Sequence, residues 1–282
     1  MNCGPGNIAN AVDFFIKMKP PPFELGNHVC VVLAGTSGIG EAIVKEMIRQ
    51  GANVMVMGRR EESCQRLATE CATEFKRAPE YVVGDLREPS SPEAVVKAAM
   101  NRWGKVSILI NNCGGPKAGT FESFNDSDWE DAFQATFMCY VRAIRACIPF
   151  FRQQKYGRIV NIASCSTKTA LTNLVLSNSI RMGIIGLAKT LASELGNDGI
   201  LINSISPGKI DTNRIKQLDQ LRAQSLGLSS EELRKENYRE IPLGRYGTAT
   251  EVATLAAFLC SPLNTYLTGQ NIMIDGGLIR AY

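Results

Sequence analysis

The sequence predicts a single α/β domain built on one doubly wound parallel sheet of about seven strands, with helices on both faces. From residue 28 onward, short apolar runs alternate with amphipathic helical patterns, which is typical of strands buried on both sides. A glycine-rich turn follows the first of these runs. The 282 residues, 45% of them hydrophobic, are enough to bury a sizeable core.

The predicted strands share an apolar interior and comprise residues 28–34, 53–58, 81–85, 107–112, 158–164, 201–207 and 271–275. Helical patterns between them cover 40–50, 61–75 and 128–153, and Ser229 to Glu232 has the spacing of a helix start. Residues 23–282 are therefore predicted to form the domain, with right-handed crossovers.

Residues 1–22 are predicted to be an N-terminal appendage. Ile8, Val12 and Phe15 fall on one face of a short helix, and the prolines at 20–22 end it. Such a helix would pack on the domain or on a neighbouring subunit. A disordered tail is the alternative.

Composition excludes several classes of function. The net charge of +4 comes from scattered basic residues, whereas nucleic-acid binders concentrate theirs on one face. No apolar run reaches the roughly 18 residues of a membrane span, and no signal peptide is evident. The nine cysteines form no Cys-x-x-Cys pair, which favours free thiols in a reducing cytoplasm. The single histidine, His28, rules out most metal sites, so no metal is predicted.

The stretch "LAGTSGIG", residues 33–40, lies between the first predicted strand and the first predicted helix. Gly35, Gly38 and Gly40 allow a tight turn and a close approach of the backbone to phosphate. Backbone N–H groups at the start of the helix would then face the anion. This placement between strand and helix predicts a dinucleotide-binding, Rossmann-type fold.

Further motifs follow in order: "GDL" at 84–86, "NNCG" at 111–114, "PGKIDT" at 207–212 and "YLTGQNIMIDGG" at 266–277. With these motifs the chain resembles the short-chain dehydrogenase/reductase family over residues 24–278, especially its 3-oxoacyl-(acyl carrier protein) reductase-like members. The resemblance implies hydride transfer between a nicotinamide cofactor and a carbonyl or alcohol substrate, and a homo-oligomer, either tetramer or dimer. Ala34 stands where the family has its first glycine, and we expect Gly35 to relieve the turn instead.

The resemblance also implies a set of cofactor contacts. They are Gly35, Thr36, Ser37, Gly38, Ile39, Gly40, Asp85, Leu86, Asn112, Cys113, Gly114, Arg181, Pro207, Gly208, Ile210 and Thr212.

The end of the second strand favours NADP(H) over NAD(H). An acidic residue there would bind the ribose 2′-hydroxyl and repel a 2′-phosphate. This chain has Gly58 at that position, followed by Arg59 and Arg60, whose guanidinium groups suit a phosphate. The alternative is that both arginines are simply solvated charges.

The catalytic positions depart from the family pattern. Ser164 fits the family's serine, but counting 13 residues on gives Ser177 where the family has tyrosine, and four more give Arg181 where it has lysine. Thr136 stands in place of an asparagine. Ser164, Ser177 and Arg181 are the predicted catalytic residues, and they could bind a carbonyl oxygen or developing alkoxide. A serine is a poor acid and an arginine cannot relay a proton, so the proton must come from water or another group. Lys168, just past Ser164, is a candidate donor, and a solvated loop lysine is the alternative.

Two functions follow. The first is an NADP(H)-dependent oxidoreductase with an altered proton relay, for which a 3-oxoacyl thioester is one candidate substrate. The second is a non-catalytic dinucleotide-binding protein, a sensor or partner subunit, in which Arg181 only pairs with a carboxylate at an interface. A redox role of Cys113 or Cys165 is a third, less favoured hypothesis.

Overall fold

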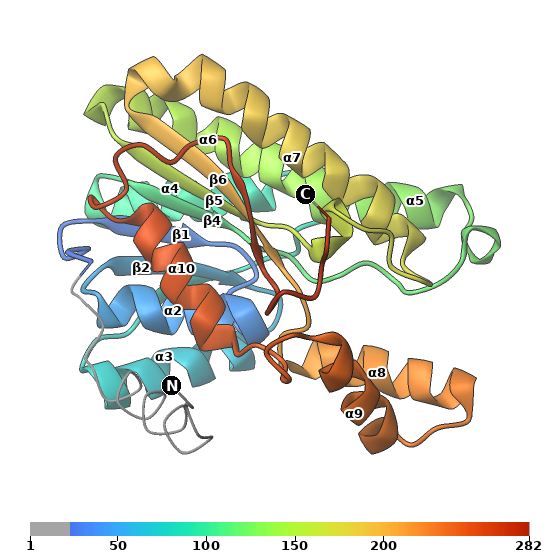
Figure 1. The fold of residues 1–282 in the computed structure, drawn as a ribbon. Helices are drawn as coiled ribbons and strands as arrows, with labels where there is room; N and C mark the ends of the chain where they lie inside the picture. Colours follow the sequence, from blue (N-terminus) through green and yellow to red (C-terminus); the bar gives the residue numbers. More distant parts are fainter. Residues whose placement is uncertain (1–22, 282) are drawn as a thin grey trace, which may run out of the picture.

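The computed structural model describes residues 23–281, so the predicted appendage at 1–22 lies outside the described residues. Seven parallel strands form one sheet in the order β3-β2-β1-β4-β5-β6-β7 (Figure 1). This confirms the predicted fold class and all seven predicted strands. The strands are β1 (Val29–Val32), β2 (Asn53–Gly58), β3 (Glu80–Val83), β4 (Ile108–Asn111), β5 (Gly157–Ile162), β6 (Ile200–Pro207) and β7 (Asn271–Ile274).

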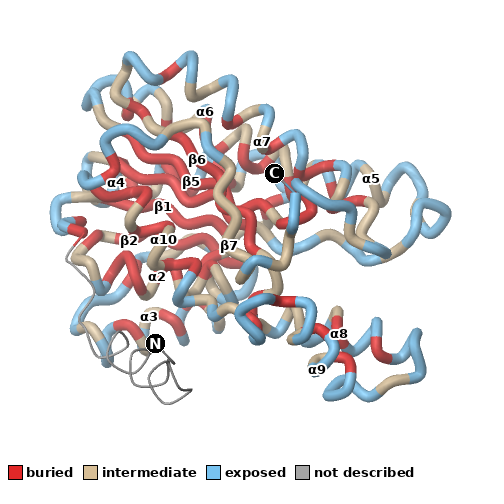
Figure 2. Tube along the Cα trace, viewed as in Figure 1, coloured by how far each residue is buried: buried red, intermediate tan, exposed pale blue. Residues whose placement is uncertain are grey.

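Helices cover both faces of the sheet, and each layer has its own apolar core. One core lies under α2 (Gly38–Arg49), α3 (Glu61–Phe75) and α10 (Ala249–Cys260). The other lies under α4 (Ser91–Trp103), α6 (Cys139–Gln154) and α7 (Val175–Leu195). Every residue of β1, β4 and β5 is buried between these layers, as Figure 2 shows for the central strands. Burial on both sides explains why these strands are mostly apolar, although Asn111 in β4 and Arg158 and Asn161 in β5 are buried polar residues.

The predicted helix over 128–153 is divided in the structure. It begins earlier, as α5 (Asp126–Phe133), because Asn125 and Asp128 form a capping box. A π-helix, η2 (Gln134–Met138), then joins α5 to α6. Short 3₁₀ turns lie at η1 (Phe121–Ser123), η3 (Cys165–Thr167) and η4 (Gly196–Asp198).

The helices α8 (Asn213–Leu226) and α9 (Ser230–Glu240) stand apart from the sheet, beyond the end of β6 (Figure 1). The α9 helix begins where the sequence predicts, because Ser229 and Glu232 form a capping box. Within residues 23–281, none of the helices combines the length and apolar character that a membrane crossing requires.

The topology fixes where a ligand can bind. β1 pairs with β2 on one side and with β4 on the other, so the strand order reverses between β1 and β4. In open α/β sheets, ligands bind at such a reversal, outside the carboxyl ends of the strands. Because all seven strands are parallel, the segments that follow β1, β4, β5 and β6 meet at this edge.

Candidate active site

The glycine loop, residues 33–40, connects β1 to α2 at this edge. Gly38 has a φ of +55°, and an added Cβ would lie 3.5 Å from the Thr212 methyl group, so this loop faces the segment after β6. Gly40 leaves no space for a side chain, since a Cβ would lie 2.5 Å from the Ala34 carbonyl oxygen. Ser37 is the N-cap of α2, but its side chain makes no capping hydrogen bond. The first N–H groups of α2 can therefore serve an anion, as a bound dinucleotide phosphate requires.

The expectation that Gly35 relieves the turn is wrong. Ala34 itself adopts a φ of +45°, in the left-handed region that favours glycine, whereas Gly35 does not have a positive φ. Gly35 is needed for packing instead, because a Cβ there would lie 2.4 Å from the Val56 methyl carbon Cγ2. The loop thus holds an alanine in a strained, left-handed conformation.

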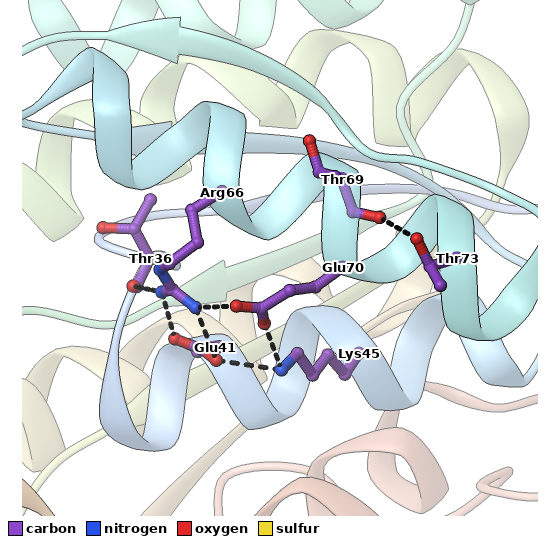
Figure 3. Close-up of polar contacts among 7 residues, drawn as sticks. All are labelled: Thr36, Glu41, Lys45, Arg66, Thr69, Glu70 and Thr73. Atoms are coloured by element: carbon purple, nitrogen blue, oxygen red, sulfur yellow. Dashed lines mark hydrogen bonds and ion pairs between the residues drawn. The ribbon is translucent and has the colours of Figure 1, made fainter.

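An ion-pair network holds the glycine loop from the side of α3 (Figure 3). Arg66 donates one hydrogen bond to the Thr36 carbonyl oxygen at 3.0 Å and pairs with Glu41, in the first turn of α2, at 2.7 Å. Glu70 binds both Arg66 and Lys45, at 2.7 and 2.8 Å. Hydrogen bonds from Lys45 and Arg66 lower the pKa of the Glu70 carboxyl group, so it stays ionised. The network fixes α3 against the start of α2.

The end of β2 cannot hold an acidic side chain without rearrangement. A Cβ on Gly58 would lie 2.5 Å from Thr36 Cγ2 and 2.8 Å from Cys64 Sγ. Arg59 and Arg60 follow, both exposed, and neither forms an ion pair within residues 23–281. These two guanidinium groups remain available for a phosphate. The residue types at this position therefore fit NADP(H).

On the loop after β3, the Asp85 side chain forms an ion pair. It pairs with Arg87 at 2.7 Å, and this hydrogen bond lowers the pKa of the Asp85 carboxyl group, with a smaller contribution from the charge of Arg59. Leu86 beside it is 8% exposed. Asp85, one of the predicted cofactor contacts, therefore stays ionised. Its partner Arg87 was not identified from the sequence.

The loop after β4 closes the other side of the cleft. Asn112 donates from Nδ2 to the carbonyl oxygens of Leu33 at 3.3 Å and Ala34 at 3.0 Å, and so ties this loop to the glycine loop. Cys113 is partly exposed. At Gly114, an added Cβ would meet nothing within 4 Å, so the backbone there borders open space. A nicotinamide ring could approach the backbone closely at this point.

Ser164 follows the end of β5, and α7 carries Ser177 and Arg181. Because they are four residues apart, Ser177 and Arg181 share a helix face, and they are only 7% and 5% exposed. The Nη1 atom of Arg181 donates to the carbonyl oxygens of Ile162 at 3.0 Å and Ala163 at 2.9 Å. The guanidinium group therefore anchors α7 to the backbone that leads into Ser164. Within residues 23–281, the partners of Arg181 are these two carbonyl oxygens and the Cys113 thiol.

Tyr140 lies close to this guanidinium group but is poorly suited to replace the family's tyrosine. It is fully buried on α6, and its hydroxyl donates to the Ile162 carbonyl oxygen at 2.9 Å and contacts Cys113 Sγ at 3.4 Å. Burial raises the pKa of Tyr140 well above its usual value. The hydroxyl is thus a fixed donor and not a general acid near neutral pH.

Thr136 lies on η2, one turn before Tyr140, where the family resemblance predicts an asparagine. Its hydroxyl is buried and has no hydrogen-bond partner among residues 23–281. A π-helix at this point is consistent with a functional site. Thr136, Ser177 and Arg181 are all buried, at 1%, 7% and 5% exposed.

The candidate thiols and the lysine differ in how well they suit their proposed roles. Cys165 is 5% exposed, and burial raises the pKa of its thiol, which disfavours a reactive thiolate. Cys113 lies 3.7 Å from Arg181 Nη2 and is the more accessible of the two. Lys168 is exposed, just after η3 and four residues beyond Ser164.

The Pro-Gly loop after β6 completes the cleft. Pro207 ends β6, and Thr212 caps α8 by accepting a hydrogen bond from the Ile215 backbone N–H at 3.4 Å. Two residues after Thr212, Arg214 reaches the loop after β4, and its Nη2 donates to the Pro116 carbonyl oxygen at 2.6 Å. The predicted residues Gly208 and Ile210 lie between Pro207 and Thr212 on this loop.

Besides Arg87, sequence reasoning missed three residues that shape the site. Tyr140 and Arg66 gave no signal, because only the folded structure brings them to Cys113 and to the glycine loop. Arg214 could have been identified, since it lies two residues after Thr212, the last residue of the Pro-Gly motif.

Known proteins match the whole described domain. The sequence model of one family, described as enoyl-(acyl carrier protein) reductase, matches residues 33–279. The chain is 31% identical over 259 residues to the 3-oxoacyl-[acyl-carrier-protein] reductase of Aquifex aeolicus. This match covers 90% of this chain and 98% of that protein.

Solved structures match equally broadly. The L-sorbose reductase of Gluconobacter frateurii, complexed with NADPH and L-sorbose, is 26% identical with a TM-score of 0.87, over 93% of this chain and 100% of that one. An NADPH-bound short-chain oxidoreductase from Pseudomonas aeruginosa, described as containing an atypical catalytic center, is 28% identical with a TM-score of 0.84, over the same shares of both chains.

Proposed function

This chain belongs to the short-chain dehydrogenase/reductase family of oxidoreductases, and we propose that it uses NADP(H) to interconvert a carbonyl compound and its alcohol. The observation that carries this proposal is the convergence of a glycine loop, a phosphate-accepting pair of arginines and the Ser164–Arg181 cluster at one edge of the sheet. A 3-oxoacyl thioester is one candidate substrate, because it is the substrate class named for the Aquifex aeolicus relative.

The chain's own residues would bind and polarise the carbonyl group. Ser164 and Ser177 offer hydroxyl donors to the carbonyl oxygen, and Arg181 supplies fixed positive charge beside them. Donors held in place before the reaction stabilise a developing alkoxide more effectively than mobile water does. When bound, the reduced cofactor supplies the hydride to the carbonyl carbon.

The proton for the alkoxide comes from solvent water in this proposal. Tyr140 is buried with a raised pKa, and Arg181 stays protonated throughout the accessible pH range. Lys168 is the alternative donor, four residues after Ser164. A Lys168→Met variant separates the two, because it would slow turnover only if the ammonium group delivers the proton.

One observation favours a second function, that of a non-catalytic dinucleotide-binding subunit. The Nη1 atom of Arg181 is occupied by two backbone carbonyl oxygens, so this arginine serves structure, and the Thr136 hydroxyl has no hydrogen-bond partner among residues 23–281. Such a protein would bind NADPH without turning over any carbonyl.

Binding and turnover, measured together, test the proposal. Fluorescence titration with NADPH and NADH comes first, followed by NADPH oxidation against ketones, aldehydes and 3-oxoacyl thioesters. We expect preferential NADPH binding and turnover that is lost in Ser164→Ala. Arg60→Gln should weaken NADPH binding more than NADH binding, whereas Arg239→Gln, an exposed residue on α9, should change neither. Tight NADPH binding without turnover on any carbonyl would favour the non-catalytic alternative.

Assembly and compartment belong to the same proposal. Phe133 on α5 and Met182 on α7 are 41% and 51% exposed, which suits a contact between copies of the chain, in a tetramer or dimer. Eight cysteines are free within residues 23–281, which supports a reducing, cytoplasmic environment. Light scattering of the purified protein gives the oligomeric state.

A further inference from the structure

Two guanidinium groups border the loop after β4, one on each side of Gly114. Arg181 approaches from α7, with Nη2 3.7 Å from Cys113 Sγ. Arg214 approaches from the first turn of α8, where it binds the Pro116 carbonyl oxygen at 2.6 Å. Gly114 between them faces open space, since an added Cβ would meet nothing within 4 Å. The candidate reaction site therefore has a positive charge on either side.

Arg214 is held in position by backbone rather than by a counter-charge. Its guanidinium group lies against Gly115, where an added Cβ would be 3.1 Å from both Nε and Nη2. A side chain at 115 would therefore require the guanidinium group to shift by a few tenths of an ångström. Thr212, two residues earlier, caps α8 and fixes the turn that carries Arg214. The Arg214 side chain is thus partly buried and lies against the loop after β4.

Neither guanidinium group has an acidic partner. Among residues 23–281, Arg181 contacts two carbonyl oxygens and a thiol, and Arg214 contacts a single carbonyl oxygen. Burial lowers the pKa of Arg214, and the nearby charge of Arg181 lowers it further, so the two cations repel each other. Both remain protonated at neutral pH. An anion that enters the cleft would relieve this repulsion and fill the donor sites of Arg214 that bind no protein acceptor.

We propose that Arg214, supported by the charge of Arg181, forms a carboxylate subsite, so that the substrate is a compact ketone that carries a carboxylate group near its carbonyl. The carbonyl oxygen would lie toward Ser164 and Ser177, and the carboxylate toward Arg214. This inference rests on the proposed reductase function and narrows its substrate class from carbonyl compounds in general to oxo acids.

Charge and position favour an oxo acid over the other anionic or carbonyl-bearing groups. A 3-oxoacyl thioester has no charge beside its ketone, so it would leave both guanidinium groups uncompensated. The cofactor diphosphate is the other anion that could use Arg214. However, the contacts of Arg214 are with Gly115 and Pro116, on the loop after β4 that Arg181 also borders.

Matched acids and esters test this subsite. Pyruvate, acetoacetate and levulinate are each compared with the corresponding methyl ester, which keeps the ketone and removes the charge. Binding is measured by calorimetry to the enzyme saturated with NADP⁺, which cannot transfer a hydride, so the result does not depend on turnover. Turnover with NADPH and the dissociation constant of NADPH are measured in parallel. The variants are Arg214→Gln and Arg214→Lys, with Arg222→Gln, an exposed residue on the same helix, as control.

We expect at least one acid to bind the wild-type complex about ten- to hundredfold more tightly than its ester, the range typical of a hydrogen bond to a charged group. Arg214→Gln should abolish this preference, Arg214→Lys should keep part of it, and Arg222→Gln should keep all of it. The NADPH dissociation constant should stay the same in all three variants.

Three results would overturn the subsite: no acid preferred over its ester, a preference that survives Arg214→Gln, or weaker NADPH binding in Arg214→Gln with an unchanged preference. The last would assign Arg214 to the cofactor diphosphate. Turnover of esters without any acid preference would refute the subsite alone. Acid binding that depends on Arg214, without NADPH oxidation by any carbonyl, would refute the reductase function alone.

Discussion

Replacing Arg181 with methionine separates its structural contribution from its chemical one. Methionine has a similar length, but it removes the charge and both hydrogen bonds to the end of β5. The Ile162 carbonyl oxygen would keep one donor, because the Tyr140 hydroxyl also binds it at 2.9 Å. The Ala163 carbonyl oxygen would lose its bond to Arg181. The variant therefore tests how firmly Arg181 joins α7 to Ser164.

The expected loss of stability follows from these contacts. A hydrogen bond to a charged group contributes about 1.5–3 kcal/mol, and two such bonds are removed. Part of this is offset, because a buried guanidinium group no longer has to be desolvated and one carbonyl keeps a partner. We expect the free energy of unfolding to fall by about 2 kcal/mol, which corresponds to about 4–8 °C in melting temperature for a domain of this size.

Urea unfolding, followed by the fluorescence of Trp103 and Trp129 at one fixed protein concentration, measures this loss. The control is Arg239→Met, an exposed arginine on α9, which should unfold like the wild type. A stability of Arg181→Met within about 0.5 kcal/mol of the wild type would refute the anchoring role. Turnover of the folded variant then shows whether Arg181 also takes part in the reaction. If its role is purely structural, Arg181→Met loses stability while its turnover stays unchanged.

The remaining predictions concern backbone shape, packing and pH. Ala34→Gly should stabilise the protein by about 0.5–1 kcal/mol, because it relieves a positive φ of 45°, and unchanged urea unfolding would contradict this. Gly58→Ala should destabilise it by about 1–3 kcal/mol and weaken NADPH binding, because its Cβ would lie 2.5 Å from Thr36 Cγ2, while Gly186→Ala, in open space on α7, should do neither. A hydrogen bond from Arg245 lowers the pKa of Glu251 to about 2, so its stabilisation is complete above about pH 4.5 and is lost as the pH falls toward 2. Glu251→Gln should therefore lower stability at pH 7 by about 0.5–1 kcal/mol, a difference that shrinks in urea titrations at lower pH. Because no tyrosine titrates at the reaction site, kcat for carbonyl reduction should stay flat between about pH 6 and 9, and a steep fall that Lys168→Met leaves unchanged would contradict the water-supplied proton.

The fold could be predicted because each strand carries its own signal. β1, β4 and β5 are buried on both faces, so their sequences are mostly apolar, and the helices between them show a clear amphipathic period. The division of residues 128–153 by a π-helix could not be predicted in this way, since its hydrogen bonds shift by one residue without changing the apolar pattern.

The cofactor half of the site could be placed from sequence more easily than the catalytic half. A dinucleotide site depends on backbone shape, and glycines such as Gly38 mark that shape directly. Even there, the role of Gly35 was misjudged, because its contact with Val56 depends on strand pairing rather than on the loop. The catalytic half depends on side chains from separate elements. Spacing located Ser177 and Arg181, but their partners on β5 and α6 became visible only in the folded chain.

The contacts of Arg181 argue against the idea that this site is a family tyrosine–lysine site that has lost its function. An unpartnered guanidinium group buried to this degree would be strongly destabilising. Here the end of β5 offers two carbonyl oxygens at 2.9–3.0 Å, and Cys113 lies at the other side of the group. A second guanidinium group, on Arg214, then occupies the space that Gly115 leaves open. The arginines are thus accommodated by two separate segments, the end of β5 and the loop after β4, as expected of a site organised around positive charge rather than around a tyrosine hydroxyl.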